Sequence, residues 1–199
     1  MAISAKMVQE LRARTNVGMM DCKRALEEAD GVMDKAVELL RKRGIAKAES
    51  RAGRQAKEGA IASYIHAGSQ LGVLLEINSE TDFVARTDEF QTFSKDVAMH
   101  IAAAAPLVVN REDVDAEMLE KEKNIYRDQA LSEGKPEHIV DRIVEGRMEK
   151  YYQEVVLMEQ AFVKDPDKTI QDLHSDLVAK CGENITIRRF ARFVLGEES

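Results

Sequence analysis

Two hydrophobic periodicities follow one another along this chain of 199 residues. In the first forty residues, apolar side chains recur every three or four positions, which is the spacing of amphipathic helices. From Leu71 to Ile77 they alternate instead, as in a strand with one buried face. Because the two patterns occupy separate blocks, we expect an α+β fold, with a small sheet covered by helices.

The N-terminal block predicts a module of three short helices within residues 1–43. Ser4 is a suitable N-cap for the first helix, and the segments TNVG and DG are short connections that force close helix packing. The next stretch, residues 44–58, is rich in charge and is interrupted by glycine. We interpret it as a linker that is partly helical.

The alternating segments lie in residues 59–199, which we expect to form the core domain. The runs GAIASYIH and LGVLLEI are separated by AGSQ and predict a hairpin. The run NITIRRFARFVL predicts a third strand of an antiparallel sheet. Two helices should cover this sheet, one with an apolar stripe that ends before Pro106 and one from about Thr169 to Lys180. One face of the third strand, broken only by Arg189, is expected to hold Ile185, Ile187, Ala191, Phe193 and Leu195.

A third segment is inserted into this core at about residues 115–157. Its two arms are charged and have helical periodicity, and the turn SEGKP lies between them. The pattern predicts an antiparallel helical hairpin.

Composition and charge limit the kinds of function that we expect for this chain. No run approaches the roughly 18 apolar residues that span a bilayer, and Arg12 precedes any signal-peptide core, so we expect a cytoplasmic protein without membrane contact. Cys22 and Cys181 have no CxxC partner and predict neither a disulfide framework nor a zinc site. Residues 1–57 hold 13 Lys/Arg against 8 Asp/Glu, whereas residues 58–199 hold 16 against 28. An acidic core of this kind argues against an extended nucleic-acid groove.

The sequence offers no catalytic constellation, so we do not expect an enzyme. The only Gly-Lys pair, Gly134–Lys135, is followed by Pro136 where a phosphate-binding loop needs Ser or Thr. The four histidines lack metal-ligand spacing, and there is no GxSxG motif. Cys22 lies on an apolar helical stripe and is interpreted as a core thiol. Neither a metal nor a cofactor is predicted.

The segment INSETDFVARTDEF allows two interpretations. In the first, Ser79 and Asp82 form a helix cap while Phe83 turns into the core. In the second, the junction between strand and helix is a rigid mount from which Phe83 enters a pocket of a partner protein. The pattern alone leaves both open.

The chain closely resembles the bacterial elongation factor Ts family over nearly its whole length. The resemblance is carried by VQELRARTNVGMMDCKRALEEADG, TDFVAR, HIAAAAP, EGRMEKYYQEV and GENITIRRFARF, in that order. It implies an N-terminal module similar to ubiquitin-associated domains, an α+β core and an antiparallel coiled-coil hairpin. With one copy of the core pattern, the chain looks like a short form, which the resemblance implies to be a homodimer.

The resemblance also implies a function, namely guanine nucleotide exchange on elongation factor Tu, in its GDP-bound and nucleotide-free forms. The resemblance assigns the dislocation of Mg²⁺ on that partner to Thr81, Asp82, Phe83 and Val84. A second contact, through the N-terminal module, would involve Arg12, Met19 and Met20. A different class stays open as the alternative: a nucleic-acid-associated helical protein that uses the basic segment 41–57. That segment lacks interleaved aromatics, and no direct nucleic-acid contact is expected.

Overall fold

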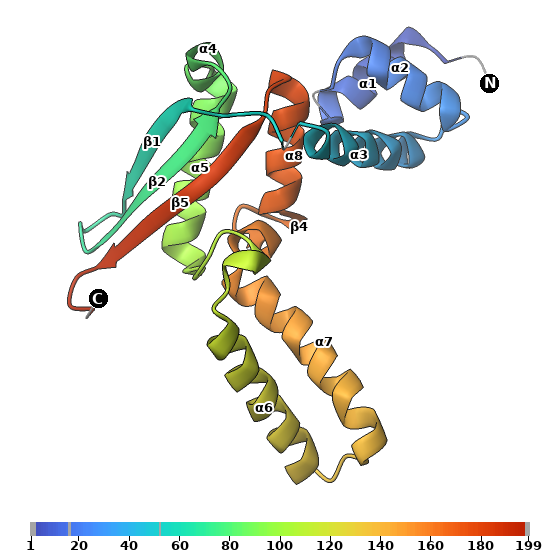
Figure 1. The fold of residues 1–199 in the computed structure, drawn as a ribbon. Helices are drawn as coiled ribbons and strands as arrows, with labels where there is room; N and C mark the ends of the chain where they lie inside the picture. Colours follow the sequence, from blue (N-terminus) through green and yellow to red (C-terminus); the bar gives the residue numbers. More distant parts are fainter. Residues whose placement is uncertain (1–2, 16, 52, 198–199) are drawn as a thin grey trace. The chain divides into compact units, whose positions relative to one another are not determined.

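The structure is a computed structural model that describes residues 3–15, 17–51 and 53–197 (Figure 1). Asn16, in the predicted first connection, and Ala52, in the predicted linker, lie outside the described residues. The elements, in chain order, are α1 (Ala5–Thr15), α2 (Met19–Glu28), α3 (Met33–Glu49), β1 (Glu58–Ile65), β2 (Leu71–Ser79), α4 (Asp82–Ala85), α5 (Asp88–Ala104), η1 (Arg111–Asp113), α6 (Ala116–Ser132), α7 (Glu137–Val155), η2 (Leu157–Glu159), β3 (Ala161–Phe162), β4 (Asp165–Thr169), α8 (Ile170–Cys181) and β5 (Ile185–Val194). This mixture of helices and antiparallel sheet agrees with the predicted α+β class.

Contacts divide the chain into two compact units, each built from segments distant in sequence. The first comprises Met1–Ala60, Ile77–Ser94 and Asp172–Thr186, and the second comprises Ile61–Glu76, Lys95–Gln171 and Ile187–Ser199.

The first unit contains the three N-terminal helices. Ser4 accepts a hydrogen bond from the backbone N–H of Met7, as its position before the helix predicts. Cys22 is fully buried, which agrees with its interpretation as a core thiol. The apolar core of this module consists of Val8, Leu11, Cys22, Ala25, Leu26, Ala29, Ala36 and Leu40.

Helix α3 passes through residue 43 without a break and continues to Glu49, so the start of the predicted linker is helical. Gly44 is buried on the side of α3 that faces Ala179 of α8. Arg41, three residues earlier, donates two hydrogen bonds to the carboxylate of Asp172 on α8. Because these contacts stabilise α3, the low helix propensity of glycine does not end it.

The three long strands form one sheet in the order β1–β2–β5 (Figure 1). Gly59 allows β1 to approach β2, because a Cβ atom at this position would lie only 2.1 Å from the carbonyl oxygen of Ile77. The buried face of β2 consists of Val73, Leu75 and Ile77, as the alternation predicts. In α5, the predicted stripe of Phe90, Phe93, Val97 and Ile101 is likewise buried.

The predicted face of the third strand is wrong in its second half. Ile185 and Ile187 are buried, but Phe193 and Leu195 are exposed. The alternation of burial changes phase at Arg188 and Arg189, which are both exposed and both form ion pairs with Glu76 of β2. Two consecutive outward residues shift every later side chain to the opposite face of the sheet.

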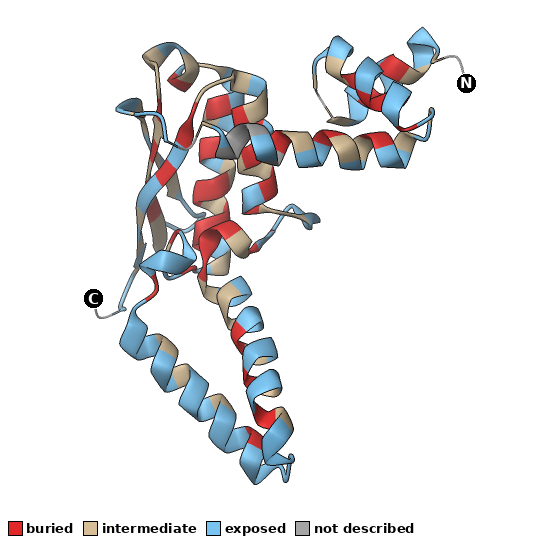
Figure 2. Ribbon diagram, turned by 45° about the vertical axis from the view of Figure 1, so that its right-hand side comes forward, coloured by how far each residue is buried: buried red, intermediate tan, exposed pale blue. Residues whose placement is uncertain are grey.

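The second unit contains the helical hairpin, whose arms α6 and α7 match the predicted segment at about 115–157. Gly134 turns the chain between them with a φ of 74°. Figure 2 shows the buried residues of α7 along the side that faces α6; they are Val140, Val144 and Met148, and they pack with Ala130 of α6. The ribbon of β3 and β4 in the same unit was not predicted from the sequence.

Candidate functional site

The segment between β2 and α5 forms a short, exposed helix that is held at both ends. Ser79, the last residue of β2, is buried, and its hydroxyl donates a hydrogen bond to the carbonyl oxygen of Thr81. Thr81 is the N-cap of α4, and its side chain accepts a hydrogen bond from the N–H of Val84 at 3.4 Å. The predicted cap formed by Ser79 and Asp82 is therefore wrong, because Thr81 has this role and Asp82 is the first helical residue.

The opposite end of α4 is fixed by Thr87 and Gln91. The hydroxyl of Thr87 donates to the carbonyl oxygen of Val84 at 2.8 Å and accepts from the N–H of Phe90. The side-chain amide of Gln91 donates to the carbonyl oxygen of Ala85 at 2.7 Å. These bonds satisfy backbone groups that such a short helix cannot pair by itself.

Phe83 presents its ring to solvent with 77% of the residue exposed. This exposure excludes the first interpretation, in which the ring enters the core, because Phe90, seven residues later, occupies that environment and is fully buried. The carboxylate of Asp82 is also accessible and forms an ion pair with Arg86 at 2.8 Å. Val84 is half-buried. An acid and an aromatic ring are thus presented side by side on a fixed turn.

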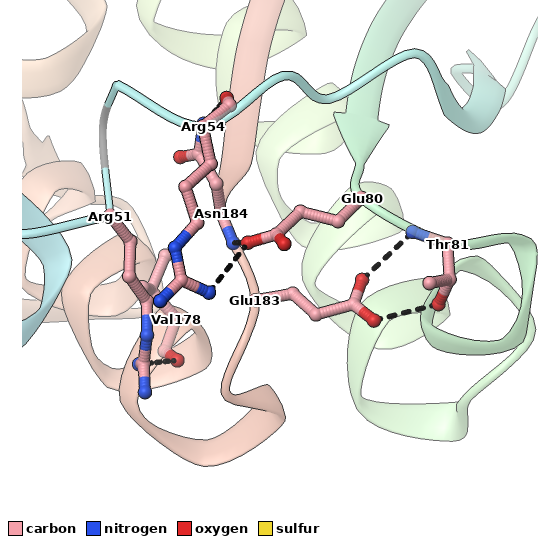
Figure 3. Close-up of polar contacts among 7 residues, drawn as sticks. All are labelled: Arg51, Arg54, Glu80, Thr81, Val178, Glu183 and Asn184. Carbon is pink, nitrogen blue, oxygen red and sulfur yellow. Dashed lines mark hydrogen bonds and ion pairs between the residues drawn. The ribbon is translucent and has the colours of Figure 1, made fainter.

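Polar residues from two distant segments surround the start of α4 (Figure 3). The carboxylate of Glu183 accepts hydrogen bonds from the backbone N–H and the hydroxyl of Thr81, at 3.0 and 2.7 Å. Glu80 accepts a hydrogen bond from the N–H of Asn184 at 2.6 Å and from the guanidinium of Arg54 at 3.4 Å. These contacts were not predicted from the sequence, although Glu183 and Asn184 belong to the motif GENITIRRFARF.

The residues predicted for the second contact lie on α1 and α2. Met20 is 67% exposed, Met19 is 38% exposed, and Arg12 is also exposed. Met19 therefore lies outside the buried core of the module. Exposed methionine side chains are flexible and apolar, and they are suited to a protein interface.

The described residues offer neither a metal site nor a membrane-spanning helix. Within the part of the chain that the structure describes, no group of three or more His, Cys, Asp or Glu residues is arranged to hold a metal ion. Over the same residues, none of the helices combines the length and the apolar character needed to cross a membrane.

An α+β fold that presents a fixed acidic–aromatic turn suggests a protein that acts by contact with another macromolecule. Comparison with known proteins identifies its class as the translation elongation factors: a family model described as "Elongation factor TS" matches residues 4–197. The chain therefore belongs to the elongation factor Ts family.

Individual relatives agree with this assignment over nearly their whole length. The chain is 60% identical to "Elongation factor Ts" of Carboxydothermus hydrogenoformans over 195 residues, which cover 98% of this chain and 90% of that protein. It is 58% identical to the protein of the same name from Geobacter sulfurreducens, with 99% and 91% covered. For Caldanaerobacter subterraneus subsp. tengcongensis the identity is 57%, with 98% of both chains covered.

Proposed function

We propose that this chain is a guanine nucleotide exchange factor for elongation factor Tu and promotes release of GDP by dislocating Mg²⁺. The observation that carries the proposal is the exposed ring of Phe83 on a helix that is fixed at both ends. A large aromatic side chain that is already held in position loses little conformational freedom on binding, so it makes an effective interface anchor.

In this proposal, α4 enters the GTPase beside its magnesium site. Phe83 acts as a wedge, Asp82 disturbs the polar contacts that hold the ion, and Thr81 and Val84 complete the segment. Mg²⁺ bridges phosphate oxygens and neutralises their charge, so weakening its supports weakens the binding of GDP. By linkage, GDP weakens the binding of the factor by the same ratio, which allows incoming nucleotide to expel it. The chain itself forms no covalent intermediate and needs no cofactor.

The N-terminal module supplies a second contact in this proposal, through Arg12, Met19 and Met20. We propose that the module is of the ubiquitin-associated type and that α6 and α7 form a coiled-coil hairpin. Once one of the two contacts has formed, the chain holds the other close to its binding surface on the partner, which raises its effective concentration there. We place the protein in the cytoplasm, where translation elongation takes place.

We also propose that two copies associate through the outer face of the sheet. In the second unit this face exposes several apolar side chains. Gly72 leaves room for one of them, Ile65, because a Cβ atom on residue 72 would lie 2.9 Å from the Cδ1 of Ile65. Two sheets can stack face to face and bury such surfaces about 10 Å apart. The exposed apolar residues are Ile61, Ile65, Leu74, Phe193 and Leu195.

The alternative function, nucleic-acid binding by segment 41–57, loses support from its ion pairs. Arg41 binds Asp172, Lys42 pairs with Glu38, Arg43 pairs with Glu28, and Arg54 reaches Glu80. A cation that already has a carboxylate partner has less charge to offer a phosphate backbone.

The test is the rate of release of fluorescent GDP from elongation factor Tu, measured by stopped flow. We expect the chain to accelerate release, and Phe83→Ala to remove most of that acceleration without lowering the melting temperature. Phe90→Ala is the matched control, because truncation of the same residue type in the core should cost about 3–5 kcal/mol of stability. A Phe83→Ala protein that releases GDP at the parent rate, or a parent chain without effect on release, would contradict the proposal.

A further inference from the structure

The loop between α8 and β5 binds two of the three polar groups of Thr81, the residue that caps α4. Thr81 has three such groups: its N–H, its carbonyl oxygen and its hydroxyl. The N–H and the hydroxyl both donate to the carboxylate of Glu183, and the carbonyl oxygen accepts a bond from Ser79. The hydroxyl oxygen also accepts from the N–H of Val84. No polar group of Thr81 therefore depends on solvent.

The helix α4 has four residues and is not stable by itself, because isolated helices shorter than about 12–15 residues are marginal in water. The direction of α4 must therefore be set by the groups that contact its ends. At the N-terminal end Glu183 holds two of the three polar groups of Thr81, including the N-cap hydroxyl at 2.7 Å, whereas Ser79 holds only the carbonyl oxygen. Hydrogen bonds to an ionised acceptor are roughly twice as strong as neutral ones.

The neighbouring residue of the loop holds the chain that precedes the sheet. The side-chain amide of Asn184 donates to the carbonyl oxygen of Arg54 at 2.7 Å, while its backbone N–H donates to Glu80. Figure 3 shows both carboxylates, Glu80 and Glu183, between this loop and Thr81, the N-cap of α4. Two adjacent loop residues thus fix both the base of the exposed turn and the segment that follows α3.

We infer that Glu183 is the positioning residue of the exposed turn, holding Thr81 so that Phe83 is presented in one orientation. The inference rests on the proposed exchange function, since it assigns Glu183 a role that is exerted through Phe83. Glu183 need not contact the partner at all. Its removal leaves the ring present but allows α4 to reorient.

The decisive experiment combines Glu183→Ala with Phe83→Ala and measures GDP release from elongation factor Tu at saturating factor. We expect Glu183→Ala alone to slow release about tenfold, because misplacement of a contact group by about 1 Å can have effects of that order. In the Phe83→Ala background the same change should slow release no further. A residue with a general structural role would slow release equally in both backgrounds, and that result would overturn the inference.

Glu183→Gln supplies the conservative variant. Its amide oxygen can accept from the N–H of Thr81, and its NH₂ group can donate to the hydroxyl, so we expect release within about twofold of the parent. Glu197→Ala is a control for removal of a glutamate, because the carboxylate of Glu197 pairs with Arg192 and has no contact with α4 among the described hydrogen bonds and ion pairs. Slowing by Glu197→Ala as large as that by Glu183→Ala would contradict the assignment.

A second measurement separates this inference from the exchange function. In Glu183→Ala, amide hydrogen exchange should become faster at residues 82–85 and stay unchanged in α1 and α2. If the parent chain does not accelerate GDP release, the proposed function fails, and the faster exchange still shows that Glu183 positions the turn. Unchanged protection at residues 82–85 would overturn the positioning role, whatever the release rates.

Discussion

The guanidinium of Arg86, the C-cap residue of α4, lies 2.8 Å from the carboxylate of Asp82, the first residue of that helix. Both side chains are accessible to solvent, and the ion pair spans the whole length of this short helix. Because Thr81 caps the helix, Asp82 has no capping role, and its carboxylate pairs with Arg86 at the surface instead.

We expect Asp82→Asn to slow nucleotide exchange while leaving the stability of the fold nearly unchanged. The variant loses an exposed ion pair, which is worth about 0.2–1 kcal/mol, so its melting temperature should stay close to that of the parent. The release of GDP from elongation factor Tu should nevertheless slow, though less than with Phe83→Ala, because the carboxylate can no longer compete for the contacts around Mg²⁺. Stopped-flow release and thermal melting on the same preparation check this. A parent-like release rate would show that the charge of Asp82 is not used.

Met20 should contribute to binding but not to folding. Its side chain is exposed on α2, so Met20→Ala should leave the melting temperature unchanged and weaken association with elongation factor Tu about three- to tenfold. Titration calorimetry with the GDP-bound partner measures this. Glu27→Ala, an exposed substitution on the same helix, serves as the control. Equal affinities for the Met20→Ala variant and the parent would remove the second contact from the proposal.

The sequence predicted the elements well because their periodicities are long and regular. Helix α5 and strand β2 show this, since each has one apolar stripe that the structure buries. The predicted face of β5 was wrong beyond Ile187, because a local change of register leaves no mark in the pattern of apolar residues. Glu183 was missed for a different reason: its partner Thr81 lies 102 positions away, and no local spacing encodes that contact.

Arg41 should matter for stability although it is largely exposed. Its guanidinium binds Asp172, whose side chain is only 10% exposed, and this bond raises the pKa of Arg41 above its usual value. Arg41→Ala should cost about 1–2 kcal/mol, since hydrogen bonds to charged groups contribute on that scale. Lys42→Ala removes only an exposed pair with Glu38 and should cost less than about 0.5 kcal/mol. Chemical denaturation of both variants tests the difference, and equal losses would contradict it.

The outer face of the sheet should control the oligomeric state. A charge placed in the centre of an apolar interface must be desolvated, so Phe193→Asp should convert a dimer of 22.3 kDa chains into monomers. Sedimentation velocity at micromolar concentration measures the mass. Phe83→Asp is the control, because it introduces the same charge at an exposed phenylalanine of α4 and should leave the mass unchanged. A parent chain that sediments as a monomer would refute the dimer.

A buried histidine in the second unit makes the stability depend on pH. His100 is fully buried, its Nδ1 accepts a hydrogen bond from the N–H of Val163, and its Nε2 lies 2.9 Å from the side-chain oxygen of Gln160. This arrangement requires a neutral ring with the proton on Nε2, because a protonated Nδ1 could not accept from Val163. Burial lowers the pKa of His100, although the hydrogen bond to Gln160 acts in the opposite direction.

The sign of the pH effect follows from this lowered pKa. The folded state binds a proton less readily than the unfolded state, whose histidine pKa is about 6.5, so stability is complete above that value and is lost as the pH falls towards the folded-state pKa. The melting temperature should therefore fall between pH 7 and pH 5. Burial also lowers the pKa of His174, so His100→Gln should reduce this slope without abolishing it. The test is the slope of melting temperature against pH, because replacing a buried side chain also changes the absolute melting temperature. A variant with the slope of the parent would show that His100 does not titrate with unfolding.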